Sequence, residues 1–139
     1  MEHAAVRAVL DHYLTHSAAG DETAAHSIYL DDAVLEFPQS GERFEGVAAF
    51  LPWRSRYPAR VEYQVRRLRG AADVWIAELL FRYDGGPWQQ ALDILEFRGD
   101  KVAAESIYVF EGWDAPDWRA RWWAAPPQRP GAEPPTTGD

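Results

Sequence analysis

The chain of 139 residues is short enough for one domain, and its 47% hydrophobic residues can bury a substantial core. Its formal net charge of -8 argues against nucleic acid as a partner, because binding a polyphosphate depends on clustered Lys and Arg. The absence of cysteine excludes disulfides, thiolate nucleophiles and cysteine-ligated metals. No apolar run approaches the ~18 residues of a membrane span and no signal sequence is visible, so we expect a cytoplasmic protein without a membrane partner.

The first 29 residues predict two helices. Apolar residues recur at helical spacing over residues 3–18, which is typical of an amphipathic helix. Gly20 should end this helix, and Asp21 is a suitable N-cap for a second, short helix that reaches about Tyr29. The acidic pair at residues 31–32 is expected to close the two helices.

A short strand and a third helix follow. Residues 34–37 predict a strand that ends at Pro38, and residues 39–45 have the composition of a turn. The third helix should begin near Gly46 and end at Pro58, because proline disfavours helical geometry in the residue before it.

Four long strands are predicted from residue 61 onwards. Their ranges are about 61–69, 74–83, 88–97 and 102–110, separated by short segments rich in Gly and Asp. Such short connections join antiparallel neighbours in hairpins. Helices followed by a meander of strands predict an α+β domain with the helices packed on one face of the sheet.

The C-terminal segment has two parts. Trp118 and Trp122 lie one turn apart on a predicted short helix that could cover the pocket as a lid. Beyond it the composition becomes rich in Pro, Gly and Thr, so we expect a folded domain at residues 1–123 and a disordered tail at residues 124–139.

Several stretches resemble the nuclear transport factor 2-like superfamily, in particular its SnoaL-like members. Ala-Gly-Asp at 19–21 and Leu-Asp-Asp-Ala-Val at 30–34 resemble the start of steroid delta-isomerases and SnoaL-like polyketide cyclases. The run 91–102 resembles their final hairpin, and Pro-Gln-Ser-Gly-Glu-Arg at 38–43 resembles a subgroup of SnoaL-like proteins. The similarity covers about residues 3–123 and implies a cone-shaped, curved antiparallel sheet packed against three N-terminal helices, the cystatin-like architecture.

The resemblance to steroid isomerases implies roles for three positions. The oxyanion-hole tyrosine of the family falls on Tyr13 and its protonated oxyanion-hole aspartate on Asp93. The proton-shuttling aspartate falls on Phe37, so the base of that mechanism is missing. The epoxide-hydrolase pattern of two aspartates bridged by an arginine is also incomplete, because no inward-facing arginine is expected.

The last hairpin predicts which side chains face the pocket. A two-residue turn at residues 99–100 pairs Phe97 with Val102 and Asp93 with Ser106. Opposed residues share a face, so Ser106, Tyr108 and Phe110 should lie beside Asp93, with Glu105, Ile107 and Val109 on the other face. The resemblance places five residues of the preceding strand inside: Trp75, Ala77, Leu79, Phe81 and Tyr83.

These placements predict an apolar, aromatic cavity with a few polar groups, which is the usual anatomy of a small-molecule site. The candidate catalytic residues are Asp93, Tyr13 and Tyr108. The candidate substrate-binding residues are Phe37, Phe50, Trp53, Trp75, Phe81, Tyr83, Ser106, Phe110 and His26. A carboxyl group desolvated in such a cavity has a raised pKa and can act as an acid. Alternatively, Asp93 is a buried acid without a chemical role, and Tyr13 a core tyrosine.

Metal and cofactor sites are not expected. His12 and His16 are spaced to share a metal on one helix face, but no third ligand is evident. The sequence therefore predicts a cofactor-independent enzyme of isomerase, cyclase, dehydratase or hydrolase type that acts on a hydrophobic carbonyl or polyketide-like metabolite. The alternative is a non-catalytic binding protein for a hydrophobic small molecule.

A homodimer is also predicted. The outer sheet face would carry Val74, Ile76, Leu80, Ile94, Ile107 and Val109, which is too apolar for a water-facing surface.

Overall fold

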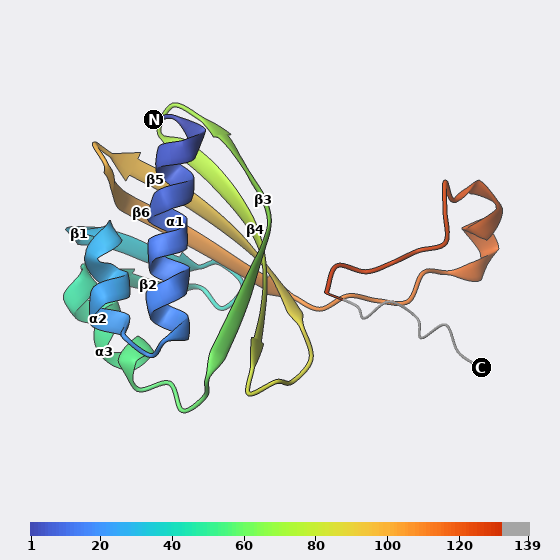
Figure 1. Cartoon of the computed structure of the whole chain (residues 1–139), viewed down its shortest axis with the longest axis horizontal. Coiled ribbons are helices and arrows are strands. Elements are labelled where there is room, and N and C mark those ends of the chain that lie inside the picture. Colours follow the sequence, from blue (N-terminus) through green and yellow to red (C-terminus); the bar gives the residue numbers. More distant parts are fainter. Residues whose placement is uncertain (132–139) are drawn as a thin grey trace.

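Helices pack against one side of a six-stranded sheet in the computed structural model, which describes residues 1–131 (Figure 1). The helical segments are α1 (His3–Ala18), α2 (Glu22–Ala25), the 3-10 turn η1 (His26–Ile28), α3 (Val47–Ser55) and the 3-10 segment η2 (Asp117–Trp122). The strands are β1 (Tyr29–Phe37), β2 (Glu42–Glu45), β3 (Val61–Ala71), β4 (Val74–Tyr83), β5 (Gln89–Arg98) and β6 (Lys101–Phe110). The expected α+β fold is confirmed.

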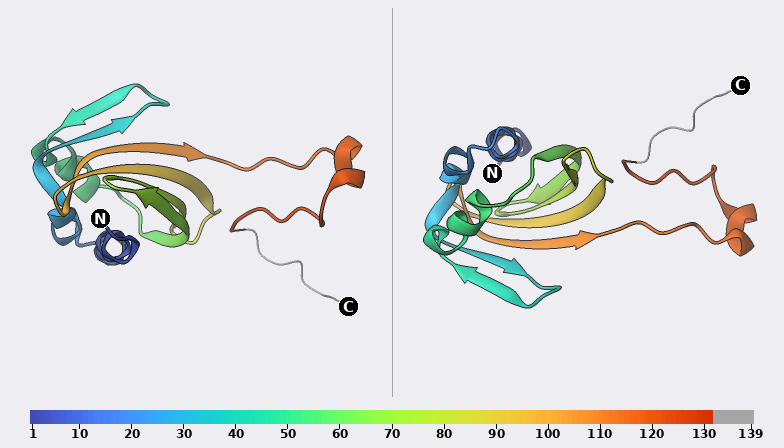
Figure 2. Two further views of the ribbon diagram at one scale, coloured as in Figure 1. Left: turned by 90° about the horizontal axis from the view of Figure 1, so that it is seen from above. Right: turned by 90° about the horizontal axis from the view of Figure 1, so that it is seen from below.

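The sheet is curved and open, with the strand order β2-β1-β6-β5-β4-β3. β3 to β6 form the expected antiparallel meander, whereas β1 pairs with β6 in parallel, so the sheet is mixed rather than purely antiparallel. Figure 2 shows α1 end-on, lying across the concave side of the sheet. No helix within residues 1–131 is long and apolar enough to cross a membrane.

The N-terminal helices follow the sequence closely up to residue 28. α1 buries Val6, Leu10 and Leu14 along one face, and Gly20 then adopts a left-handed φ of 81° that ends it. The Asp21 carboxylate accepts a hydrogen bond from the Ala24 N–H at 3.1 Å and caps α2.

Two expectations about the next segment are wrong. The acidic pair at residues 31–32 does not close the helices but lies inside β1, with both side chains exposed to solvent. The segment predicted as a turn contains β2, which pairs with residues 34–37 of β1. Both errors come from taking charged residues as the ends of secondary-structure elements. A hairpin at the edge of a sheet accommodates such residues on its solvent-facing side.

A β-bulge in the last hairpin changes which β6 residues face the helices. Phe97 pairs with Val102 as expected, but Glu96 pairs with Ala104, so Ala103 is an extra residue in β6. Because side chains alternate along a strand, this one-residue insertion exchanges the two faces of β6 beyond it. Asp93 therefore pairs with Ile107 instead of Ser106.

Because of the bulge, several β6 side chains lie on the face opposite to the one expected. Glu105, Ile107 and Val109 lie on the concave face, and Ser106, Tyr108 and Phe110 lie on the convex face, the reverse of the expectation. The apolar outer face accordingly consists of Val74, Ile76, Leu80, Leu92, Ile94, Tyr108 and Phe110, without Ile107 and Val109.

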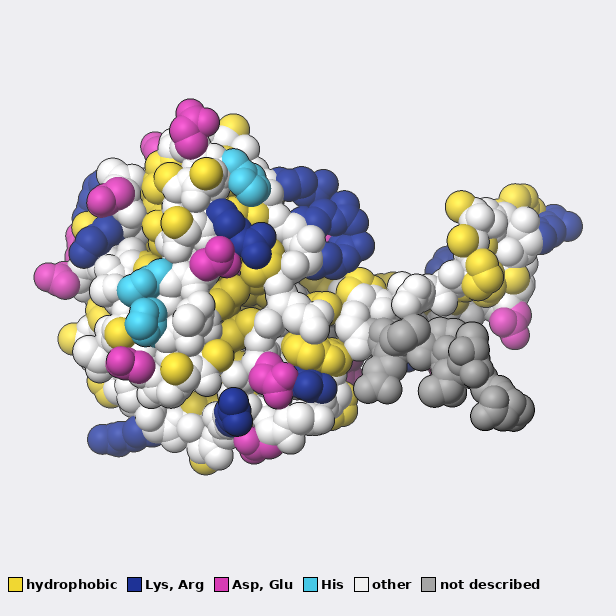
Figure 3. Space-filling view, viewed as in Figure 1, with side chains coloured by type: hydrophobic (Ala, Val, Ile, Leu, Met, Phe, Trp, Pro, Cys, Tyr) yellow, Lys and Arg dark blue, Asp and Glu magenta, His cyan; other side chains and the backbone are white. Residues whose placement is uncertain are grey.

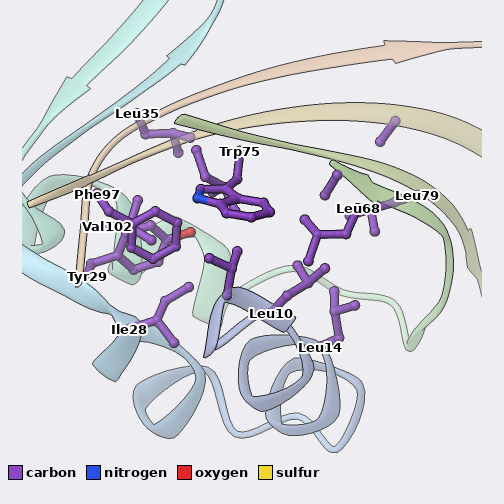
Figure 4. Packing of buried hydrophobic residues seen from close by; sticks show 14 of the residues in the cluster. Leu10, Leu14, Ile28, Tyr29, Leu35, Leu68, Trp75, Leu79, Phe97 and Val102 are labelled. Atoms are coloured by element: carbon purple, nitrogen blue, oxygen red, sulfur yellow. The ribbon is translucent and has the colours of Figure 1, made fainter. Parts of the chain in front are cut away.

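The hydrophobic core fills the end of the sheet that carries the β3–β4 and β5–β6 turns (Figure 4). Leu10 and Leu14 of α1 pack towards Leu68 and Trp75 of the sheet. Gly70 permits this close β3–β4 connection, because a Cβ there would lie 2.3 Å from the Val74 carbonyl oxygen. The opposite end of the concave face remains open for a cavity.

Residues 111–131 form an arm that continues the direction of β6 away from the body and then returns (Figures 1 and 2). The expected lid is wrong, because η2 with Trp118 and Trp122 stands clear of the body at the end of this arm. Residues 124–131, predicted as part of the disordered tail, form the returning limb, in which a Cβ on Gly131 would lie 2.8 Å from Trp88 Cβ. The rest of that prediction, residues 132–139, lies outside the described residues.

Candidate active site

A cavity of about 600 Å³ lies between the C-terminal half of α1, α3 and the concave sheet face. Its wall contains the aromatic residues Tyr13, Phe37, Trp53, Tyr57, Tyr63, Phe81 and Tyr83. Figure 3 shows hydrophobic side chains between α1 and β3, on the side where the cavity meets solvent. Its size and apolar walls suit a small organic molecule.

Two carboxyl groups lie together in the cavity wall. Asp93 of β5 and Glu105 of β6 are 7% and 5% exposed and sit on adjacent strands of the concave face. Burial raises the pKa of Asp93 well above its ordinary value, and the charge of Glu105 and a hydrogen bond between the two carboxyls raise it further. Asp93 therefore keeps its proton under conditions in which an exposed aspartate is ionised.

Glu105 is held by a hydroxyl group and a nearby cation. The Tyr29 hydroxyl donates a hydrogen bond to Glu105 Oε1 at 2.5 Å, and Arg54 Nη2 lies 4.0 Å from the same oxygen. The raised pKa of Asp93 keeps a proton on that carboxyl, beside a Glu105 side chain that contacts a hydroxyl and a cation. Two carboxyl groups, one of them a proton donor, thus stand side by side in one apolar cavity.

Arg54 is the cation of this site. Its side chain is only 11% exposed, and its Nη1 donates to the Tyr29 hydroxyl at 3.1 Å. The guanidinium also lies over the Phe50 ring, 5.3 Å from the centroid. The expectation that no arginine faces inward is therefore wrong.

His26 holds Arg54 from behind the cavity. Its Nδ1 donates to the Glu22 carbonyl at 2.6 Å, which leaves Nε2 as an acceptor for Arg54 Nη1 at 3.2 Å. Burial, followed by the positive charge of Arg54, lowers the pKa of His26 to about 4. The ring is neutral at physiological pH and lies outside the cavity lining, so it supports Arg54. The expectation that His26 faces a ligand is therefore wrong.

Tyr13 projects from α1 into the cavity. Burial raises the pKa of its hydroxyl above the ordinary value for tyrosine, so the group remains a hydrogen-bond donor at any physiological pH. Among residues 1–131 this hydroxyl has no hydrogen-bond partner, which leaves it free for a ligand.

Three buried polar atoms of the cavity residues have no hydrogen-bond partner within the described part of the chain: Glu22 Oε2, Trp53 Nε1 and Asp93 Oδ1. Such atoms are costly in a folded protein, and each is a natural contact for a polar group of a ligand. They come from α2, α3 and β5, so they surround the cavity.

Apart from His26, the sequence-predicted site residues fall into three groups. Six line the cavity: Tyr13, Phe37, Trp53, Phe81, Tyr83 and Asp93. Phe50 and Trp75 belong to the buried core, 0% and 4% exposed, and not to the lining. Ser106, Tyr108 and Phe110 lie on the convex face because of the bulge, so their assignment to the cavity is wrong.

Arg54 and Glu105 were missed, although each had a signal in the sequence. Arg54 follows the core residue Phe50 by four positions, which places both on one face of α3. For Glu105, the alternative hairpin register would have put two apolar residues, Ile107 and Val109, inside in place of Ser106 and Tyr108. Within residues 1–131, no group of three or more His, Asp or Glu is placed to hold a metal ion.

Comparison with solved structures identifies the family. A protein of unknown function described as NTF-2 like, from Burkholderia xenovorans LB400, shares 37% sequence identity with a TM-score of 0.80. The alignment covers 88% of this chain and 95% of that one. The chain belongs to the NTF2-like family. No protein-family model matches the sequence of this NTF2-like chain, and no curated protein does.

More distant NTF2-like structures share the fold alone. A candidate ketosteroid isomerase from Kribbella flavida DSM 17836 is 20% identical, with a TM-score of 0.76 over 90% of this chain and 92% of that one. An LEH-like epoxide hydrolase from M. tuberculosis is 16% identical, with a TM-score of 0.65 over 76% of this chain and 82% of that one. These NTF2-like proteins carry different chemistries on one scaffold, so the site must decide the function.

Proposed function

We propose that the chain is a cofactor-independent enzyme that catalyses proton transfer on a small hydrophobic carbonyl or polyketide-like compound. The observation that carries this proposal is the pair formed by Asp93 and Glu105 in the wall of an apolar cavity. Two adjacent buried carboxyl groups, of which Asp93 holds its proton, can supply the acid and the base that such chemistry requires.

Each residue has a distinct role in the proposed reaction. Glu105 takes a proton from a substrate carbon, or from a water molecule whose oxygen bonds to a substrate carbon as the bond from that carbon to the substrate oxygen breaks, while Asp93 gives its proton to the substrate oxygen on which negative charge develops. Tyr13 donates a hydrogen bond to the same oxygen and loses no proton. The hydrogen bond between the two carboxyls then lets the proton pass from Glu105 back to Asp93, which restores the starting state.

Glu105 can supply the base that is missing at Phe37. In the steroid-isomerase pattern the base falls on Phe37, a cavity-wall residue that has no proton to exchange. Glu105 offers a carboxylate from another strand, so the proposed reaction does not need an acid at that position. The structural similarity to a candidate ketosteroid isomerase and to an epoxide hydrolase supports acid–base chemistry as the reaction class. It does not decide whether Glu105 takes its proton from a substrate carbon or from water.

A non-catalytic binding protein is the second candidate, favoured by the mainly aromatic wall and by the unpartnered Trp53 Nε1. The two candidates differ in what the carboxyl pair does. Burying an acid costs free energy that a binding protein could avoid with an apolar side chain, whereas an enzyme must retain it. Substituting the pair therefore separates the candidates.

The test begins with a screen of hydrophobic enones, epoxides and polyketide-like compounds for thermal stabilisation of the protein, and stabilising compounds are then assayed for conversion. Asp93→Asn and Glu105→Gln are each expected to lower the turnover of a substrate by about 10²–10⁴-fold, the usual contribution of a positioned acid or base. Compound binding should survive, because both variants keep the size of the side chain. Ser106→Ala, on the same strand but on the convex face, is the matched control and should retain full activity.

Equal turnover by the wild type and both carboxyl variants would exclude this mechanism. Stabilisation by a compound without conversion, together with tighter binding in Asp93→Leu, would establish the binding-protein alternative.

A further inference from the structure

The arm at residues 111–131 exposes three tryptophans, Trp113, Trp118 and Trp122, at 75%, 75% and 64%. Taking ~250 Å² for a fully exposed tryptophan side chain, they present roughly 500 Å² of aromatic surface to solvent. A single exposed apolar residue is ordinary, but three exposed tryptophans within ten residues of one arm indicate an interaction surface.

The arm has a defined shape although its tip stands clear of the body (Figure 2). Arg129 of the returning limb approaches Asp114 of the outgoing limb at 3.9 Å and packs against Gly112. At the tip, the guanidinium of Arg121 lies 4.0 Å from the ring centroid of Trp122. The arm therefore has a defined shape and still leaves each of its three tryptophans more than 60% exposed.

The part of the convex sheet face that carries Val74 and Ile76 is a second exposed apolar surface, whereas Leu80 on the same face is 5% exposed. Val74 is 45% and Ile76 39% exposed, and the neighbouring Ile94 is half-buried. No helix of the described chain covers this side of the sheet (Figure 2). The molecule thus carries both a projecting aromatic arm and an apolar face that could receive one.

We propose that the arm of one protomer lies along the convex sheet face of a second copy of this chain. Trp118 and Trp122 then cover Val74 and Ile76 of that copy, and the second arm does the same in return. The arrangement has a two-fold axis that crosses the two sheets near Phe110, where each arm begins, so each arm runs over its partner from that end.

The length of the arm fits this arrangement. Phe110 pairs with Gln90, and Val74 pairs with Glu96, so the distance along β5 between these two levels is six residues. At about 3.4 Å per residue this distance is roughly 20 Å. The seven residues from Phe110 to Asp117 extend over at most roughly 24 Å, which carries the tip of the arm to the level of Val74.

Charge also matches. Arg66, Arg67 and Arg69 on β3 all contact the single carboxylate of Glu78, at 2.8, 3.5 and 3.1 Å, which leaves two positive charges in excess. Figure 3 shows basic side chains gathered over β3. The outgoing limb carries three acidic residues, Glu111, Asp114 and Asp117. The arm also carries Arg119 and Arg121 beside its tryptophans, so charge favours contact of this basic cluster with the outgoing limb and not with the tip.

The buried area suits a stable dimer. A standard interface removes about 800 Å² from each partner. The aromatic surface of the arm, added to the exposed parts of Val74, Ile76 and Phe110, reaches this order for each protomer. A membrane surface is the less favoured occupant, because the net charge of -8 opposes adsorption to anionic lipid.

The first test measures mass by sedimentation at about 10 µM. The full chain is expected to sediment as a dimer, and Trp118→Ala/Trp122→Ala should raise the dimer dissociation constant by about 100-fold or more. Tyr57→Ala removes a 53% exposed aromatic residue outside the proposed interface and should leave the mass unchanged. A monomeric wild type, or a tryptophan variant that dimerises as well as the wild type, overturns the proposal.

A second test uses the absence of native cysteine. Val74→Cys/Arg119→Cys should form a covalent dimer under mild oxidation, visible on a non-reducing gel, and neither single variant should match its yield. A disulfide that forms only within one chain would show that the arm folds back on its own sheet. This result would overturn the proposed exchange of arms between two protomers. Cosedimentation of monomeric protein with phosphatidylcholine vesicles, lost in the tryptophan variant, would identify a membrane as the occupant instead.

Discussion

The buried, neutral His26 should make the stability of the protein depend on pH in a predictable direction. Its pKa is about 4 in the folded protein, against an ordinary value of 6.5 that applies to the unfolded chain. The unfolded chain therefore takes up a proton at a higher pH than the folded protein does. The contribution of His26 to the free energy of unfolding is fully present above about pH 6.5 and is lost as the pH falls towards 4.

The magnitude follows from the difference between these two pKa values. At 1.36 kcal/mol for each unit, the change from 6.5 to about 4 corresponds to about 3 kcal/mol. The side chain is 1% exposed, so solvent screening reduces this figure little. Asp93 acts in the opposite direction, because its raised pKa makes the folded protein bind a proton more tightly. The effect of His26 must therefore be isolated by comparison with a variant.

Urea unfolding of the wild type and His26→Gln at several pH values between 4 and 8 provides that comparison. Glutamine retains an acceptor for Arg54 and does not titrate, so the contribution of Asp93 cancels in the difference between the two proteins. The advantage of the wild type in unfolding free energy should shrink by about 3 kcal/mol from pH 7.5 to pH 4. A difference that stays constant over this range would refute the neutral, buried state of His26.

Two further variants test the packing around the site and the sheet. Arg54→Met should destabilise the protein by about 3–5 kcal/mol in urea unfolding, since it leaves the buried Glu105 without its cation, and adding Glu105→Gln should recover part of the loss. Gly70→Ala should cost more than about 2 kcal/mol, because its Cβ meets backbone atoms of Val74 and Trp75. Gly85→Ala, which has no atom within 4 Å of the new Cβ, is the control and should cost only the roughly 1–2 kcal/mol of a left-handed backbone. Equal losses at the two glycines would contradict the steric account.

The long strands and α1 were predictable because their signals are local. Apolar spacing and turn residues placed α1, β4 and the hairpins of β3–β6 within a few residues of their observed bounds. The inward side chains of β4 were also correct, since no bulge follows Trp75 in its pairing with β5.

The composition of the site was harder to predict, because it depends on a single residue. The turn at residues 99–100 was correct, but nothing in the turn reveals that Ala103 is bulged out three positions later. That one residue brings Glu105 to Asp93 and removes Tyr108 from the cavity. Arg54 was missed for a different reason, since a charged residue on a short helix is usually solvent-exposed and only its partners explain its burial.

The parallel pairing of β1 with β6 determines when the site can form during folding. β3 to β6 are joined by short turns and can pair locally, whereas β1 must meet a strand about seventy residues further along the chain. Glu105 receives its hydrogen bond from Tyr29, the first residue of β1, so the acid–base pair acquires its final environment only when this distant contact closes. A ligand that binds in the cavity would stabilise the folded state, including this distant contact, by an amount that grows with its concentration relative to its Kd.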